Sequence, residues 1–180
     1  MAIVNTYLGL KEISDKEYWH LVSSSGVNAD MFKNNVRCGK GCVPSVSAII
    51  TNEPHLENAQ TPYSLSRRED LKEQLFEEVR QKYFIHLPSR IKTLYVFDEY
   101  SLAEKAQAEW FKNEPKEIHE CRIINGSKYF RADTTWLNCS QDQWQEFASR
   151  YWNGEMSGNP FPEVLVDGVL YFPNWLEFTA

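Results

Sequence analysis

The sequence lacks long apolar segments and an excess of positive charge. No run approaches the roughly 20 apolar residues that a membrane-spanning helix needs, and the opening MAIVNTYLGLKEISDKE has neither a basic start nor a long apolar stretch. The 19 Lys and Arg residues face 25 Asp and Glu residues, which gives a net charge of −6. Non-specific binding to phosphate backbones depends on the opposite excess, although these totals still allow a local basic groove. We therefore expect a cytoplasmic protein with no membrane partner.

Cysteine is also scarce. Of four cysteines, only Cys38 and Cys42 are close together, in the segment CGKGC. Three intervening residues fit a zinc site, but there is no second close pair and the histidines form no ligand-like pattern. We therefore favour free thiols in a reducing compartment and expect no metal. The segment GKGCVPS also lacks the Gly-Lys-Ser/Thr ending of a phosphate-binding loop.

The remaining composition is that of a folded globular protein. The chain has 180 residues, of which 42% are hydrophobic, 24% charged and 14% aromatic. This excludes disordered, collagen-like and coiled-coil classes and predicts one domain over residues 1–180. Most of the aromatic rings are expected to fill its core, although some could stack on a base or a nicotinamide ring.

The first third of the chain has little regular pattern. Tyr18 to Ser23 is an aromatic and β-branched run that predicts a strand carrying His20. Residues 26–65 contain scattered Asn, Gly, Pro and Ser, and only Val43 to Ile50 looks ordered. We expect residues 26–65 to form an irregular insertion or cover.

Three capping boxes predict helices in the rest of the chain. They begin at Ser66, Ser101 and Ser140. The expected helices are residues 67–83, a helix ending near Asn113, and a helix whose apolar face contains Trp144, Phe147, Ala148 and Tyr151. On the first helix, the apolar face contains Phe76 and Val79, and we place Glu73 and Arg80 largely elsewhere.

Short strands alternate with these helices. Thr93 to Phe97 predicts one strand, and two hairpins are expected, across Asn125-Gly126 and across Asp167-Gly168. The hairpin strands are residues 117–124 with 128–132, and 163–166 with 169–172. The elements together predict an α+β fold with short antiparallel strands.

Three polar residues stand on strands that otherwise look buried: His20, Tyr95 and Glu163. Taken singly, each fits a structural role, as a satisfied core histidine, a core tyrosine and a solvated carboxylate at a strand start. Their order along the chain favours a functional interpretation.

That order resembles the ADP-ribosyltransferase superfamily, in the branch with an early histidine, a middle aromatic residue and a late glutamate. The segments that carry the resemblance are WHLVSSSG, LYVFDEYSLAEKAQAEWF and PFPEVLVDGVLYF. The segment YWNGEMSGNPFPEVLV is also similar to a family of small uncharacterised bacterial or phage proteins of this fold. The resemblance implies an ADP-ribosyltransferase-like fold, with two packed sheets and flanking helices.

The resemblance also implies transfer of ADP-ribose from NAD+, the substrate, to a protein or nucleic acid. Glu163 would be the catalytic residue, and His20 would bind a ribose hydroxyl of the adenosine half. Tyr95, or Phe97 on the same strand face, would stack on nicotinamide. Arg90 fits either a pyrophosphate contact or a salt bridge on a loop.

Acceptor recognition in this superfamily uses the loop before the catalytic glutamate. Its large side chains here are Trp152 and Phe161, which are the acceptor-binding candidates. Members that modify arginine carry an acidic residue where this chain has Phe161, which argues against arginine as the acceptor. An aromatic ring at that position suits a nucleobase and an apolar protein patch equally.

The resemblance leaves several biological roles open. A mono-ADP-ribosyltransferase of this kind would act as a toxin or in defence or counter-defence, and a toxin would need an inhibitory or antitoxin partner. The alternatives are a catalytically inactive module that binds a nucleotide or protein, and an NAD+ glycohydrolase in which water replaces the acceptor.

Overall fold

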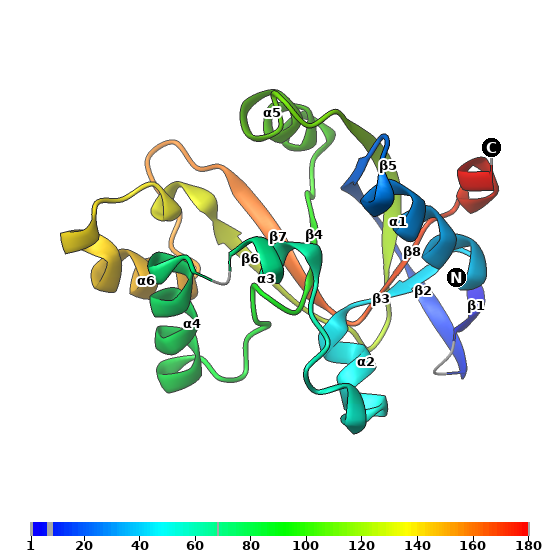
Figure 1. Ribbon diagram of the computed structural model, residues 1–180, viewed down its shortest axis with the longest axis horizontal. Coiled ribbons are helices and arrows are strands. Elements are labelled where there is room, and N and C mark those ends of the chain that lie inside the picture. The colour runs from blue at the N-terminus through cyan, green and yellow to red at the C-terminus, as the bar shows by residue number, and fades with distance from the viewer. Residues whose placement is uncertain (1, 7–8, 68, 180) are drawn as a thin grey trace. The chain divides into compact units, whose positions relative to one another are not determined.

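The computed structural model describes residues 2–6, 9–67 and 69–179. These residues form two antiparallel sheets and six α-helices, an α+β architecture (Figure 1). None of the described helices is long and apolar enough to cross a membrane. The chain divides into two compact units, unit 1 with residues 1–44, 96–127 and 168–180, and unit 2 with residues 45–95 and 128–167. A single domain over residues 1–180 stays a prediction.

Unit 1 contains a five-stranded sheet with the strand order β1-β2-β5-β8-β3. The strands are β1 (Ile3–Thr6), β2 (Gly9–Ser23), β5 (Lys116–Ile124), β8 (Val169–Tyr171) and β3 (Cys42–Pro44). Its helices are α1 (Val27–Cys38), α5 (Tyr100–Trp110) and the C-terminal 3-10 helix η4 (Trp175–Thr179). One part of its core is a cluster of small and branched apolar side chains: Ile13, Cys42, Ile124 and Val169.

The CGKGC segment is a tight turn from α1 into β3. Gly41 has a φ of 91° and Lys40 a φ of 50°, in the left-handed region that favours glycine. A Cβ atom on Gly39 would lie 2.0 Å from the backbone oxygen of Cys42, so the close approach of the two backbone segments requires glycine there. The two glycines of this segment are thereby explained by backbone geometry.

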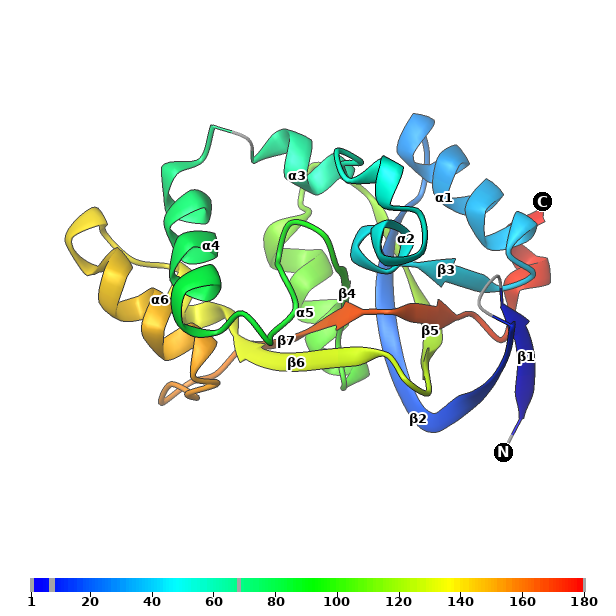
Figure 2. The ribbon, with the colours of Figure 1, turned by 90° about the horizontal axis from the view of Figure 1, so that it is seen from below.

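Unit 2 contains a three-stranded sheet with the order β4-β7-β6. Figure 2 shows β7 (Pro162–Asp167) beside β6 (Lys128–Asp133); the third strand is β4 (Leu94–Val96), whose last residue is counted in unit 1. The α-helices are α2 (Val46–Asn52), α3 (Pro62–Ser66), α4 (Leu71–Tyr83) and α6 (Trp144–Trp152). The 3-10 helices are η1 (Pro54–Leu56), η2 (Thr134–Leu137) and η3 (Gln141–Gln143).

Helices α4 and α6 lie side by side in unit 2 (Figure 1) and supply much of its core. Phe76 of α4 packs with Tyr151 and Trp152 of α6 and with Leu165 of β7. The indole Nε1 of Trp152 donates a hydrogen bond of 2.7 Å to the backbone carbonyl of Phe76. Aromatic residues thus fill much of this core, and the indole N–H that Trp152 brings into it has a backbone partner.

The prediction of an irregular segment over residues 26–65 is wrong. The segment contains α1, which is 12 residues long, and the shorter helices α2 and α3. Its Asn and Ser residues weaken the helical pattern, but Ala29 and Val36 supply a buried face, which stabilises α1 through packing. The strand predicted from Tyr18 is also longer, since β2 covers 15 residues.

One of the three capping boxes is confirmed. Ser140 forms a capping box with Gln143 at the start of η3, which leads into α6. The box predicted at Ser66 does not form, because Asp70 caps α4 by accepting hydrogen bonds from the backbone N–H groups of Lys72 and Glu73. Arg68, inside the predicted box, lies outside the described residues. The box at Ser101 is also wrong: α5 begins at Tyr100, without a side-chain cap, and ends at Trp110.

Both predicted hairpins are wrong, although their strands exist. β5 pairs with β2 and β8, whereas β6 pairs with β7, so the strands on either side of Asn125-Gly126 belong to different sheets. The same holds for β7 and β8 on either side of Gly168. A turn dipeptide favours a reversal of the chain direction. Which strands then pair with each other depends on which partners bury their apolar faces.

Candidate functional site

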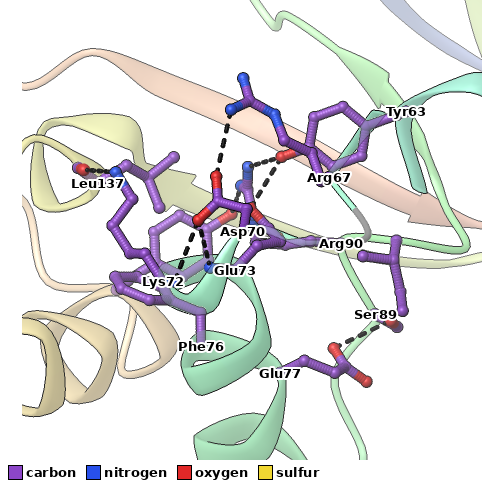
Figure 3. Close-up of polar contacts among 12 residues, drawn as sticks. Tyr63, Arg67, Asp70, Lys72, Glu73, Phe76, Glu77, Ser89, Arg90 and Leu137 are labelled. Atoms are coloured by element: carbon purple, nitrogen blue, oxygen red, sulfur yellow. Dashed lines mark hydrogen bonds and ion pairs between the residues drawn. The ribbon is translucent and has the colours of Figure 1, made fainter. Parts of the chain in front are cut away.

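A buried cluster of polar and charged groups inside unit 2 is centred on Arg90. Its guanidinium Nε donates a hydrogen bond of 2.8 Å to Oε1 of Glu73 on α4, and its Nη1 donates to Oε1 of Glu163 on β7. The side chains of Arg90, Glu73 and Glu163 are only 5%, 9% and 4% exposed. Figure 3 shows Arg90, Glu73 and Tyr63 together. One cation therefore joins two buried carboxylates from distant parts of the sequence.

Three tyrosines complete the Arg90 centre, which we define as Arg90, Glu73, Glu163 and these tyrosines. The hydroxyl of Tyr63 accepts from Arg90 Nη2 and donates to Glu73 Oε2, both at 2.9 Å. The hydroxyl of Tyr151 accepts from Arg90 Nη1 and donates to Glu163 Oε1, both at 2.7 Å. Tyr95 donates to the backbone carbonyl of Arg90. The Arg90 Cζ lies between 5.2 and 5.9 Å from all three ring centroids, within the range of a cation–π contact.

The electrostatics of the centre fix its protonation pattern. Burial raises the pKa of Tyr63, Tyr95 and Tyr151, since it disfavours the phenolate, and outweighs the opposing effect of Arg90. Burial by itself would lower the pKa of Arg90, but the carboxylates of Glu163 and Glu73 hold it well above its usual value. The tyrosines therefore remain hydrogen-bond donors, and Arg90 remains a cation.

The two oxygens of the Glu163 carboxylate differ in their surroundings. Oε1 accepts hydrogen bonds from both Arg90 and Tyr151. Oε2 receives no hydrogen bond from any residue that the structure describes. The side chain is therefore anchored through one oxygen, while the other has no hydrogen-bond partner among the described residues.

Asp133 anchors the loop that leads into Glu163. Its carboxylate is completely buried and accepts hydrogen bonds from the backbone N–H groups of Thr135, Ser157 and Phe161, at 2.8 to 2.9 Å. Burial raises the pKa of Asp133, but these hydrogen bonds outweigh it and lower the pKa to about 2. The loop thus reaches β7 with a fixed backbone, and Glu163 takes its place as the second residue of that strand.

Three predicted site residues, Arg90, Tyr95 and Glu163, meet in the Arg90 centre. Arg90 was expected at a pyrophosphate or in a salt bridge on a loop, and the structure gives it two buried ion pairs. Four of its N–H donors have protein acceptors. The ring of Tyr95 packs against the ring of Tyr63, with centroids 5.3 Å apart. Its contact with nicotinamide stays a prediction.

The two acceptor-binding candidates are buried in unit 2. Trp152 is 1% exposed and stacks on Phe130, with centroids 5.9 Å apart. Phe161 is 7% exposed, and its backbone carbonyl accepts hydrogen bonds from Thr134. Contact with an acceptor therefore requires both rings to become uncovered, and this role stays a prediction.

His20 and Phe97 belong to unit 1. His20 lies on β2 opposite His119 of β5, and its ring stacks on Phe32 at 5.2 Å. Phe97 is 3% exposed; its backbone pairs with Trp19, and its ring lies 5.9 Å from Trp110. The NAD+-binding roles of His20 and Phe97 stay predictions.

The sequence did not reveal Tyr63, Glu73 and Tyr151 as parts of the site. Tyr63 lies in the segment predicted to be irregular, and Tyr151 was assigned to an apolar helix face. Counted over the whole residue, Glu73 is 7% and Arg80 9% exposed, so their placement away from the buried face of α4 is wrong. The spacing of 73, 76 and 80 puts all three on one helical face, and this signal could have identified the buried glutamate.

The four cysteines form no disulfide. Cys38 is exposed and Cys42 buried, on either side of the turn between α1 and β3. Within the part of the chain that the structure describes, no three His, Cys, Asp or Glu side chains are arranged to hold a metal ion.

Comparison with known proteins places the chain in a family without assigning it an activity. Residues 44–174 match the model of a family described as "Protein of unknown function (DUF2441)". The matched segment contains the whole Arg90 centre, while His20 on β2 lies outside it. No curated protein sequence matches the chain significantly. Because the match covers more than half of its length, the chain belongs to the DUF2441 family.

Proposed function

We propose that the chain is a mono-ADP-ribosyltransferase that moves ADP-ribose from NAD+ to a macromolecular acceptor, with Glu163 as the catalytic residue. The proposal starts from the sequence resemblance. The observation that carries it further is the state of the Glu163 carboxylate, which is held through Oε1 and has no partner for Oε2 among the described residues. A fixed carboxylate with one oxygen free of protein hydrogen bonds suits the stabilisation of a developing cation, provided that the substrate can reach it.

The reaction breaks the bond between nicotinamide and its ribose carbon. Nicotinamide leaves with the bonding electron pair, and positive charge develops on the ribose, as in glycoside hydrolysis. Oε2 of Glu163 would accept a hydrogen bond from the neighbouring ribose hydroxyl and stabilise this charge. A lone pair of the acceptor then forms the new bond to the ribose carbon. The proton that the acceptor loses passes to Glu163 or to solvent.

Arg90 and Tyr151 act as positioning residues in this proposal. Both donate to Oε1 of Glu163, so they restrict rotation of the carboxylate and keep Oε2 in one orientation. We assign the Arg90 guanidinium to the two carboxylates rather than to the pyrophosphate of NAD+. Its bonds to Glu73 and Tyr63 hold the guanidinium in place from the opposite side.

The acceptor and the biological setting belong to the same proposal. The acceptor is a protein or a nucleic acid, and arginine is disfavoured because Phe161 stands two residues before Glu163. We place the activity in a bacterial cytoplasm, in toxin, defence or counter-defence biology, where a toxin requires an inhibitory partner. Roles for His20, Tyr95 and Phe97 in NAD+ binding rest on the resemblance.

A catalytically inactive binding module is the second candidate. The observation in its favour is the burial of the Arg90–Glu163 pair, because an ion pair with side chains 5% and 4% exposed can be purely structural. In that case Glu163 stabilises unit 2 and performs no chemistry. The two candidates differ in whether the protein releases nicotinamide from NAD+.

The test is incubation of the full chain with labelled NAD+ and a cell lysate, followed by separate protease and nuclease digestion. We expect nicotinamide release and label on a macromolecule that one of the two digestions removes. Glu163→Gln should lower both by about 100-fold, because it removes the charge that opposes the developing cation. Glu146→Gln is the matched control, since Glu146 is 61% exposed on α6, and its activity should equal that of the wild type.

Each alternative outcome has a clear meaning. Nicotinamide release without labelled macromolecule supports NAD+ hydrolysis. Absence of release by a folded wild-type protein supports the binding module. Activity of Glu163→Gln equal to that of the wild type removes Glu163 from the mechanism. Circular dichroism and thermal unfolding of each variant separate loss of activity from loss of fold.

A further inference from the structure

Unit 2 also contains a polar hollow of about 360 Å³, to which neither the sequence nor the family match assigns a function. It is lined by side chains from the end of α4, the loop that follows it, α2 and the ends of β6 and β7. Its charged residues are Glu77, Arg80, Lys92, Lys128 and Asp167, and His86 lies among them. Glu163 does not line this hollow, so an inference about it is independent of the proposed function.

One wall of the hollow is an internally neutralised ion pair. Arg80 Nη2 donates to Glu77 Oε1 at 2.7 Å and Nε donates to Oε2 at 3.0 Å, a two-point arrangement. Arg80 Nη1 donates to the backbone carbonyl of Leu87 at 2.9 Å, which fixes the loop after α4. The hydroxyl of Ser89 donates to Glu77 at 3.0 Å (Figure 3). This wall is therefore rigid and carries no net charge.

The two lysines of the hollow are not neutralised in this way. Among the described residues, neither Lys92 nor Lys128 has an ion-pair partner within 4.0 Å. Asp167 is opposite Lys128 in the β6–β7 register, and its Oδ1 accepts a hydrogen bond of 3.4 Å from Ser45. Two ammonium groups against one carboxylate leave the hollow with an excess of positive charge. This excess is local, because the whole chain has a net charge of −6.

We propose that this hollow binds a small phosphate-bearing compound. Ammonium groups are strong donors to phosphate oxygens, and the volume lies within the range of small-molecule sites. The charged lining excludes a largely apolar ligand, and Asp167 and Ser47 can bind hydroxyl groups of a phosphate ester. A small compound fits better than a nucleic acid, because the acidic chain as a whole repels an extended polyanion.

Pyrophosphate is the probe, titrated into the full chain by isothermal calorimetry at low and at physiological salt. We expect saturable binding that weakens as salt rises, since screening reduces the attraction of the half-buried Lys92 and the exposed Lys128 for an anion. Lys92→Gln and Lys128→Gln should each weaken binding about tenfold, the usual effect of losing one charge-assisted hydrogen bond. Lys82→Gln is the matched control: Lys82 is on α4 but outside the hollow, and this variant should bind like the wild type.

Three results would overturn the proposal. They are a wild-type protein that does not bind pyrophosphate, a Lys82→Gln variant weakened as much as the other two, and binding of single-stranded DNA without binding of pyrophosphate. Glu163→Gln should bind pyrophosphate like the wild type, which separates this site from the Arg90 centre. A rise in the thermal midpoint with pyrophosphate, absent in the double variant of Lys92 and Lys128, provides a second measurement.

Discussion

Tyr151 donates a hydrogen bond of 2.7 Å to the same oxygen of Glu163 that Arg90 contacts. Tyr151 is on α6 and Glu163 on β7, so this bond joins a helix to the sheet within unit 2. Because both residues are buried, this hydrogen bond stabilises unit 2. It also holds the Glu163 carboxylate in position.

Tyr151→Phe keeps the ring in the core and removes only the hydroxyl. We expect it to lower the free energy of unfolding by about 1 kcal/mol, the usual net contribution of one hydrogen bond. The loss stays small because Arg90 still donates to Glu163. Urea unfolding measures it, with Tyr129→Phe as the control, since Tyr129 is 61% exposed. Equal stability of the wild type and Tyr151→Phe would contradict the hydrogen bond.

Arg90→Met removes the cation that two buried carboxylates share. We expect a loss of about 3–5 kcal/mol, since the variant leaves buried charge without a partner. Arg67→Met is the control: Arg67 is 50% exposed in its pair with Asp70, and its loss should cost less than about 1 kcal/mol. Chemical unfolding of both variants gives the comparison.

A triple variant keeps the Arg90 prediction testable if Arg90→Met does not fold. Changing Glu73 and Glu163 to Gln in the Arg90→Met background removes the uncompensated charges. We expect this protein to regain much of the lost stability, because neutral groups are less costly to bury than unpaired ions. A triple variant no more stable than Arg90→Met would show that the charges are not the cause.

Asp133→Asn tests the anchor of the loop before β7. The pKa of Asp133 is about 2 in the folded protein against 3.8 normally. Since the folded value is lower, its stabilisation is complete above pH 3.8 and is lost as the pH falls toward 2. We expect Asp133→Asn to be about 2–3 kcal/mol less stable than the wild type at pH 7, from roughly 1.4 kcal/mol per pKa unit.

The pH dependence provides the measurement for Asp133. Urea unfolding at pH 7, 5 and 3 should show a constant difference between wild type and Asp133→Asn at the two higher values. The difference should shrink at pH 3, where the unfolded wild type binds a proton. A difference that does not change with pH would exclude the carboxylate charge as its source.

Gly39→Ala tests the turn between α1 and β3. An added Cβ would lie 2.0 Å from the Cys42 carbonyl oxygen, so the backbone must shift, and we expect a loss of about 3 kcal/mol. Gly126→Ala is the contrast, because Gly126 has a φ of 93° but nothing within 4 Å of an added Cβ. Its cost should be about 1 kcal/mol, from backbone strain alone. Equal thermal midpoints for the two variants would contradict the close approach.

Local sequence signals predicted those elements whose cause is also local. The Ser140 box depends on residues three apart, and the strand at Glu163 was predicted from the apolar run Val164 to Val166, which the structure buries. Strand pairing was mispredicted because β5 finds β2 and β8 far along the chain, and no nearby pattern encodes such a choice.

The candidate site was likewise predicted from the sequence only in part. Glu163, Tyr95 and Arg90 were selected from the sequence, and the structure brings them together with Tyr63, Glu73 and Tyr151. A polar residue on a buried strand is visible in a sequence. The partner that neutralises it is not, since Arg90 and Glu163 are 73 residues apart and meet only in the folded unit.

The alternation of the chain between its two units has a practical consequence. The chain passes from one unit to the other after residues 44, 95, 127 and 167. Any truncation between residues 45 and 167 therefore deletes part of both units, and neither can be obtained by shortening the gene from one end. Producing the half that contains Glu163 by itself requires a rearranged gene in which a designed linker connects residue 95 to residue 128.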